Sequence, residues 1–156
     1  MQANTDSLYP RTQRNRIFHQ KIGDLNMKLV NEEIRTVLKN HPLYSQEECG
    51  MNAEAMVKFF LPFGAWTWYV TEAREDADYG YLFFGLVING EGEGELGYFT
   101  LKELEEVAVP FNVNMGGKKV TIGTVCIERD EHFTPTALKD IDCPYVQEYV
   151  REFNDH

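Results

Sequence analysis

Runs of aromatic and aliphatic residues alternate with polar, glycine-containing segments through the middle of this chain. Residues 56–61 and 65–72 predict two strands joined by a tight turn, and the almost unbroken apolar run at 81–88 predicts a central strand covered on both faces. A fourth strand is expected at 95–99, after a hairpin loop at 89–94. Because these connections are short, we expect consecutive strands to pair antiparallel.

Three places carry helix-start signals. Asn31 precedes two glutamates and an apolar stripe, which is typical of an N-cap with an acidic first turn. Thr100 and Glu103 have the spacing of a capping box. Pro144 precedes apolar residues at helical spacing, as expected for a proline in a first turn. The sequence therefore predicts one helix before the strands, one after the fourth strand and one at the C-terminus.

The segment after the second of these helices is rich in asparagine and glycine. We expect that helix to run to about residue 107 and to end before Pro110, residues 112–119 to form a turn, and residues 120–128 to form an edge strand. Together the elements predict the α+β class, with a mainly antiparallel sheet of four to five strands and helices packed against it.

Charge is unevenly distributed along the chain, whose formal net charge is −10. Residues 1–26 are polar and carry +2, so the remaining residues carry −12. We expect a weakly basic N-terminal extension at 1–26 and a single domain at 27–156. Residues 72–106 alone hold ten acidic and two basic residues. Because an acidic surface repels phosphate, we expect the domain not to bind nucleic acid directly and its partner to be another protein.

Cysteine usage and hydropathy bear on the compartment. The three cysteines are widely spaced and form no CxxC pair, which favours reduced thiols over disulfides or a zinc site. No apolar run reaches the roughly 18 residues that span a bilayer, and residues 1–20 lack the pattern of a secretory signal. The sequence contains neither the phosphate-binding loop G-x-x-x-x-G-K-[ST] nor a G-x-G-x-x-G motif followed directly by a helix. We therefore expect a cytoplasmic protein without membrane contact and without a cofactor.

The aromatic residues at 66–69 have two possible roles. Aromatic side chains at a spacing of two on a strand are typical of a core, and we expect Trp66 and Trp68 to be buried on one face. Tyr69 points to the opposite face and is a candidate for a surface role, including the stacking of bases or sugars.

Two acidic segments, one on each side of the central strand, are candidates for an interaction surface. The first lies around Asp76, and in the second three glutamates alternate with glycines. The second segment lacks the ligand spacing of a calcium loop, so we expect a solvated acidic loop and no metal site. The predicted interaction surface comprises Tyr69, Glu72, Asp76, Asp78, Glu91, Glu93 and Glu95.

The densest group of different functional side chains is Glu128, Arg129, Asp130 and His132. Arg129 between two carboxylates favours an ion pair that fixes the end of a strand. A Cys126–His132 pair would need a third group to orient it, and the sequence supplies no evidence of one. We therefore assign no catalytic residue.

Several short motifs resemble those of a bacterial family of domains of unknown function, the one numbered 2958. They are the WTWY of Trp66–Tyr69, the FFGL of Phe83–Leu86, the ELGYF of Glu95–Phe99 and the LKEL of Leu101–Leu104. The resemblance covers about residues 27–138. It implies an accessory gene of plasmids, integrative elements or phages, with no catalytic motif defined.

These observations favour a non-enzymatic interaction protein over an enzyme. A sharper form of this hypothesis is an acidic mimic of nucleic acid that occupies the binding groove of a host defence protein. The alternative is a hydrolytic enzyme that uses Glu128, Asp130 and His132, or the loop at 91–95 with a metal ion. A third, weaker hypothesis is single-strand binding through Tyr69 and the arginines of residues 1–26.

Overall fold

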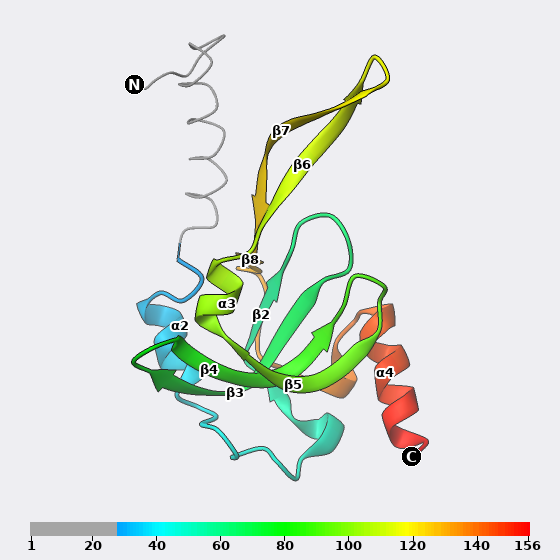
Figure 1. Cartoon of the computed structure of the whole chain (residues 1–156). Helices are drawn as coiled ribbons and strands as arrows, with labels where there is room; N and C mark the ends of the chain where they lie inside the picture. Colours follow the sequence, from blue (N-terminus) through cyan, green and yellow to red (C-terminus); the bar gives the residue numbers. More distant parts are fainter. Residues whose placement is uncertain (1–27) are drawn as a thin grey trace.

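The centre of the molecule is a five-stranded antiparallel sheet in the order β5-β4-β3-β2-β8 (Figure 1). This computed structural model describes residues 28–156, so the predicted N-terminal extension lies outside the described residues. The strands are β2 (Val57–Phe60), β3 (Thr67–Asp76), β4 (Gly80–Ile88), β5 (Gly94–Thr100) and β8 (Glu128–Arg129). All neighbouring strands run antiparallel, which confirms the predicted class and sheet.

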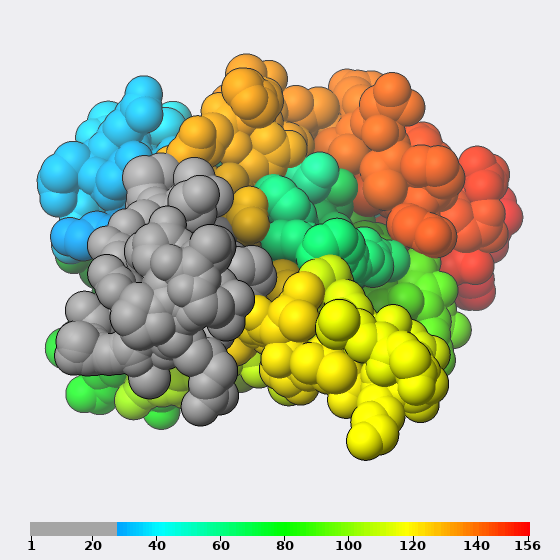
Figure 2. Space-filling view, turned by 90° about the horizontal axis from the view of Figure 1, so that it is seen from above, coloured from blue at the N-terminus to red at the C-terminus, as the bar shows by residue number. Residues whose placement is uncertain are grey.

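The central strand β4 is covered on both faces, as its unbroken apolar run predicts. Tyr81 and Phe83 belong to one core cluster, which α2 (Glu32–Leu38) and α3 (Leu101–Glu105) cover. Leu86 and Ile88 belong to a second cluster, which η2 (Leu138–Asp140) and α4 (Pro144–Asn154) cover. In both views α2 and α4 lie at opposite ends of the molecule (Figures 1 and 2). The sheet is therefore the middle layer of the domain.

All three predicted helix starts are confirmed. The Asn31 side chain accepts the backbone N–H of Ile34 at 2.8 Å, which caps α2. Thr100 and Glu103 form both hydrogen bonds of the capping box at the start of α3. Pro144 lies in the first turn of α4, where a missing N–H has no consequence.

Short elements connect these layers. The 3-10 helix η1 (Gly50–Asn52) precedes β1 (Glu54–Ala55), and β1 pairs with β9 (Thr136–Ala137) in a small second sheet. This pairing joins the segment before β2 to the segment before α4. It therefore closes the second core cluster at one side.

The segment that follows α3 differs from its prediction. The helix ends at Glu105, and β6 (Ala108–Met115) pairs with β7 (Lys118–Cys126) to form a third, separate sheet. Pro110 lies inside β6, where a proline is tolerated because the strand has a free edge. The turn is confined to Gly116 and Gly117, which both have positive φ, so the asparagines before it belong to a strand. The predicted edge strand at 120–128 corresponds to β7 (Lys118–Cys126), and the edges of the main sheet are β5 and β8 instead.

Candidate functional site

A glycine-rich loop and a helix meet to form the most distinctive surface feature. The loop joins β4 to β5, and its glycines alternate with glutamates. A Cβ atom on each glycine would lie too close to an aromatic ring: 2.8 Å from Trp66 at Gly90, 2.5 Å from Tyr145 at Gly92 and 2.8 Å from Tyr149 at Gly94. Real Cβ contacts of that length do not occur. The glycines are therefore required for the close approach of three aromatic side chains, two of them from α4.

Asn89 holds this loop in a fixed conformation. Its side-chain oxygen accepts the backbone N–H groups of Glu91 at 2.9 Å and Glu93 at 3.0 Å. The backbone N–H of Gly92 donates to the Asn89 carbonyl at 3.0 Å, and the Asn89 N–H donates to the Glu93 carbonyl at 2.8 Å. The carboxylates that alternate with the glycines thus project from an ordered turn.

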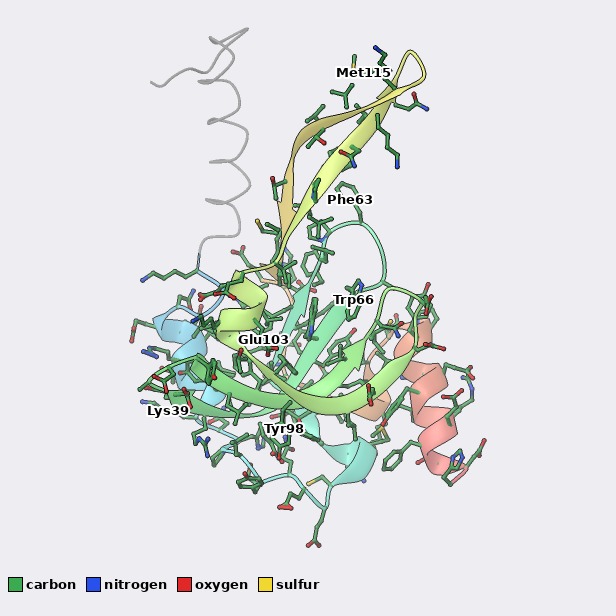
Figure 3. The ribbon with its side chains drawn as sticks, in the orientation of Figure 1. Lys39, Phe63, Trp66, Tyr98, Glu103 and Met115 are labelled. Atoms are coloured by element: carbon green, nitrogen blue, oxygen red, sulfur yellow. The ribbon has the colours of Figure 1, made fainter. Side chains whose placement is uncertain are left out.

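A groove of about 600 Å³ lies between this loop and α4. Its charged lining residues are all acidic, and its ring-bearing ones are a tryptophan and two tyrosines. The lining comprises Trp66, Val87, Asn89, Gly92, Glu93, Gly94, Glu95, Tyr145, Glu148, Tyr149 and Glu152. Arg151 approaches from the helix and is paired with Glu148. Figure 3 shows Trp66 at the end of the sheet that faces α4.

The electrostatics of the groove favour a cation. Partial burial raises the pKa of the Tyr149 phenol; a hydrogen bond with the Leu96 backbone opposes this, and the neighbouring carboxylates of Glu95 and Glu152 raise the pKa further. The phenol therefore stays neutral, with its ring beside negative charge. Aromatic rings and carboxylates are the groups that hold guanidinium and ammonium ions, through cation–π contacts and charge-assisted hydrogen bonds.

The two tryptophans behave differently from each other. Trp68 packs against the first core cluster, as predicted, but Trp66 is 39% exposed and stacks on Trp68 with ring centroids 5.6 Å apart. Trp66 precedes the first residue of β3, so the alternation of that strand does not bury it. The prediction that Trp66 belongs to the core is wrong, and its exposed ring is available to the groove.

Two residues of the predicted interaction surface are buried, which corrects the prediction. Tyr69 is 1% exposed because the second core cluster covers its face of the sheet. Glu72 is 3% exposed, and its carboxylate accepts the backbone N–H groups of Tyr44 at 2.7 Å and Gln46 at 2.9 Å. Glu72 therefore fixes the turn before η1, and neither residue reaches a partner. The weaker hypothesis of base stacking on Tyr69 is excluded by the same burial.

The remaining acidic residues of that prediction lie at two separate ends of β4. Asp76 and Asp78 belong to the β3–β4 turn, where Asp76 accepts the N–H of Asp78 at 2.8 Å. Glu91, Glu93 and Glu95 belong to the other turn, and the last two line the groove. The nine residues of β4 separate the turns by about 30 Å, at about 3.3 Å per residue. The two acidic segments do not form one surface.

The cluster at 128–132 is held by other contacts than those predicted. Arg129 donates to the carbonyls of Lys28 at 3.2 Å and Leu29 at 2.8 Å and not to its neighbouring carboxylates. Asp130 pairs with Lys58 at 3.5 Å and accepts the His132 backbone N–H at 2.9 Å. The contacts of Arg129 and the Lys58–Asp130 pair join distant segments of the chain, whereas the contact with His132 is local.

The cysteine of the suggested Cys–His pair is not activated. Burial raises the pKa of the Cys126 thiol, and the nearby Glu128 carboxylate raises it further. A raised pKa keeps the thiol protonated and weakly nucleophilic. His132 lines a different, smaller pocket of about 340 Å³ with Asp130 and Cys143. Among residues 28–156, no three His, Cys, Asp or Glu side chains are grouped so as to hold a metal ion.

The sequence analysis placed the aromatic residues of α4 on the apolar face of the helix and did not identify the groove, although a signal for it exists. Tyr145, Glu148, Tyr149 and Glu152 have the spacing i, i+3, i+4, i+7 of a single helix face. Val146 and Val150, one position further along, form the buried stripe of the same helix. An aromatic and acidic face beside an apolar face was therefore readable, but its contact with the glycine loop was not.

Comparison with known proteins identifies the family. Residues 29–140 match the family model described as "Protein of unknown function (DUF2958)", and the chain belongs to that family. No curated protein and no solved structure matches the chain. In the part of the chain that the structure describes, every helix is too short or too polar to cross a bilayer.

Proposed function

We propose that this protein is a protein-interaction factor whose groove beside α4 binds a cationic segment of a partner protein. The observation that carries the proposal is the composition of the groove lining, in which three exposed or half-buried rings stand among four carboxylates. The lining contains no lysine, arginine or histidine. An arginine or lysine side chain would supply the missing charge and stack on the rings.

The rigidity of the groove supports the same function. Gly92 and Gly94 lie close to the tyrosines of α4, and Asn89 fixes the backbone of the loop. A groove that is already formed loses little conformational entropy on binding, so more of the contact energy contributes to affinity.

A sharper form of the proposal is that the partner is a nucleic-acid-binding protein of the host, which this chain blocks as an acidic mimic in the cytoplasm. The net charge of −10 supports the mimicry. The three cysteines without disulfide partners support the cytoplasmic location. This form fits the accessory role in mobile elements that the family resemblance implies. If this form is correct, a partner that this protein captures from nuclease-treated host lysate is released by added duplex DNA, because both compete for the same binding groove.

The test uses a short oligo-arginine peptide as the probe and tryptophan fluorescence as the readout, since Trp66 lines the groove. The groove variant is Glu95→Gln combined with Glu152→Gln. The matched control is Glu33→Gln combined with Asp78→Asn, which removes the same charge from exposed positions outside the groove. We expect the groove variant to weaken binding by about tenfold or more, since hydrogen bonds to charged groups contribute about 1.5–3 kcal/mol each.

A third variant separates ring stacking from charge. Trp66→Ala leaves the net charge unchanged and removes one ring of the groove. Because this variant lacks the fluorescent reporter, its peptide binding is measured by calorimetry. We expect binding to weaken through the lost cation–π contact. If the groove variant and the control lose the same affinity, the peptide responds only to overall charge, and the groove has no special role. That result would contradict the proposal.

The hydrolase alternative has less structural support. Arg129 and Asp130 are engaged in contacts that join chain segments, and the Cys126 thiol is protonated at neutral pH. Complete loss of a measurable hydrolytic activity on substitution of His132 would favour it.

A further inference from the structure

The ribbon formed by β6 and β7 extends away from the main sheet as an arm (Figure 1). Within residues 28–156 its strands pair only with each other. A two-stranded hairpin alone is marginally stable in water, because it has too few neighbours to bury an apolar face. This arm therefore lacks the packing that holds every strand of the main sheet.

One face of the ribbon is apolar. Val109, Phe111, Val113 and Met115 alternate along β6 and point to the same side. Val120 lies directly opposite Val113 on β7, so it shares that side. The other side carries asparagine and threonine, with Asn112 opposite Thr121. The ribbon is thus amphipathic, yet Met115 is 61% exposed at its tip (Figure 3).

Phe63 extends the apolar face at the base of the ribbon. It stacks on Phe111 with ring centroids 5.0 Å apart and planes 10° from parallel, and it is itself 70% exposed. Its φ of 70° is unfavourable for a bulky residue. Backbone strain that places an aromatic ring in solvent is typical of a binding surface.

Charge has opposite signs at the two ends of the ribbon. Lys118 and Lys119 follow the turn and are exposed, and residues 108–126 contain no acidic residue. At the base, Glu105 and Glu106 precede β6, and Glu128 and Glu131 follow β7. The eight residues of β6 separate the ends by about 26 Å, several times the Debye length of about 8 Å at physiological salt. The lysines of one chain therefore do not neutralise the glutamates of the same chain.

We propose that two copies of this chain associate through their ribbons, which pack antiparallel about a two-fold axis with apolar face against apolar face. In this arrangement the lysines at each tip lie beside the glutamates at the base of the other ribbon. A two-fold interface must be self-complementary, and a ribbon that is apolar along its length and oppositely charged at its ends meets that condition. The rest of residues 28–156 is acidic, so these parts of two copies repel each other except where the ribbon carries positive charge.

The first test is sedimentation of the full-length chain from about 1 to 100 µM, where a self-associating protein changes its apparent mass with concentration. We expect a dimer. Val120→Asp places a charge on the apolar face and should weaken the dimer by about tenfold or more, through the cost of burying an unpaired charge. Thr121→Asp is the matched control, because it adds the same charge one residue away on the polar face. It should change the dissociation constant much less.

The second test leaves the apolar face intact and exchanges the charges. Lys118→Glu with Lys119→Glu makes the tip acidic. Glu105→Lys with Glu106→Lys and Glu131→Lys makes the base basic, because only Glu128 of its four glutamates then remains. Each variant alone should be monomeric, because its tip and base then carry the same sign. Mixed in equal amounts, the two variants should form a heterodimer, in which both contacts again join opposite charges.

Three results would overturn the proposal. They are a monomeric wild-type chain at the highest concentration, equal effects of Val120→Asp and Thr121→Asp, and charge variants that do not associate when mixed. A monomer whose ribbon lysines instead bind duplex DNA would assign the arm to nucleic acid, and a monomer whose ribbon is covered by residues 1–27 would assign it to its own chain. Both outcomes exclude the dimer.

Discussion

Two hairpins in this molecule have similar local sequences and different environments. The β4–β5 hairpin and the β6–β7 ribbon are both antiparallel pairs of apolar strands joined by a turn that contains glycine. In the first, both faces of β4 are covered, and the loop glycines lie close to aromatic rings from elsewhere in the chain. The second has a bare apolar face, and a Cβ on Gly116 or Gly117 would meet nothing within 4 Å. The same residue types therefore form a core in one place and a surface in the other.

The largest expected difference between the hairpins is the cost of losing an aromatic ring. Phe83 of β4 is fully buried between Phe59 and Phe99, so Phe83→Ala should lower the free energy of unfolding by about 3–5 kcal/mol. Phe111 of β6 has one ring contact, with the exposed Phe63, and Phe111→Ala should cost about 1 kcal/mol. Chemical denaturation of both variants measures the two values.

Protein concentration makes this comparison sharper. If the ribbons form a dimer interface, the cost of Phe111→Ala rises with protein concentration, because association stabilises only the folded chain. The cost of Phe83→Ala does not, since its contacts lie within one chain. If Phe83→Ala and Phe111→Ala lower the free energy of unfolding equally in dilute solution, the ribbon is packed against the main sheet of its own chain. The proposed difference between the two hairpins would then be wrong.

The strands of the body were predictable because local signals and burial agree there. The unbroken apolar run of β4, the capping box at Thr100 and the proline of α4 each specify one element, and the sheet buries all of them. The first strand of the ribbon was not predicted, because asparagines, glycines and a proline close together in sequence are typical of turns. A free-standing arm accepts such residues in a strand, since half of its backbone groups face water.

The candidate site was predictable only in part, because it depends on contacts between distant segments. The glutamates of the β4–β5 loop were identified, and two of them line the groove. The sequence did not show why glycines lie between these glutamates. Gly92 and Gly94 leave room for Tyr145 and Tyr149 of the C-terminal helix, which is distant in sequence. Alternation placed Tyr69 on the correct face, but it could not show that a helix covers that face.

A pair of glycines in β5 tests whether the loop glycines are needed for packing. A Cβ on Gly94 would lie 2.8 Å from Tyr149, whereas a Cβ on Gly97 would meet nothing within 4 Å. Gly94→Ala should therefore cost about 1–3 kcal/mol through overpacking, and it should weaken binding of the arginine peptide by displacing α4. Gly97→Ala should be neutral or stabilising by a few tenths of a kcal/mol, because alanine restricts the unfolded chain. Thermal unfolding and the peptide titration measure both, and equal stabilities would show that α4 adapts freely.

The smallest expected effect lies at the junction of body and ribbon. Glu128 begins β8, the strand that follows the ribbon, and partial burial raises the pKa of its carboxyl, with a further contribution from Glu131. The folded chain therefore holds this proton to a higher pH than the unfolded chain does. The stability that the protonated group contributes is complete below the unfolded pKa of about 4.3 and is lost as the pH rises through the folded pKa.

Glu128→Gln should consequently raise Tm slightly at neutral pH and leave it unchanged near pH 3.5, because glutamine has no charge to bury. The measurement is Tm against pH in dilute protein, with Glu131→Gln as the control, which removes only the neighbouring charge and should give a smaller gain. At high protein concentration the gain should shrink, since the proposed dimer brings the lysines of a second ribbon to the Glu128 carboxylate. A gain that is independent of protein concentration would mean that no cation approaches this end of the ribbon, and it would count against the antiparallel arrangement.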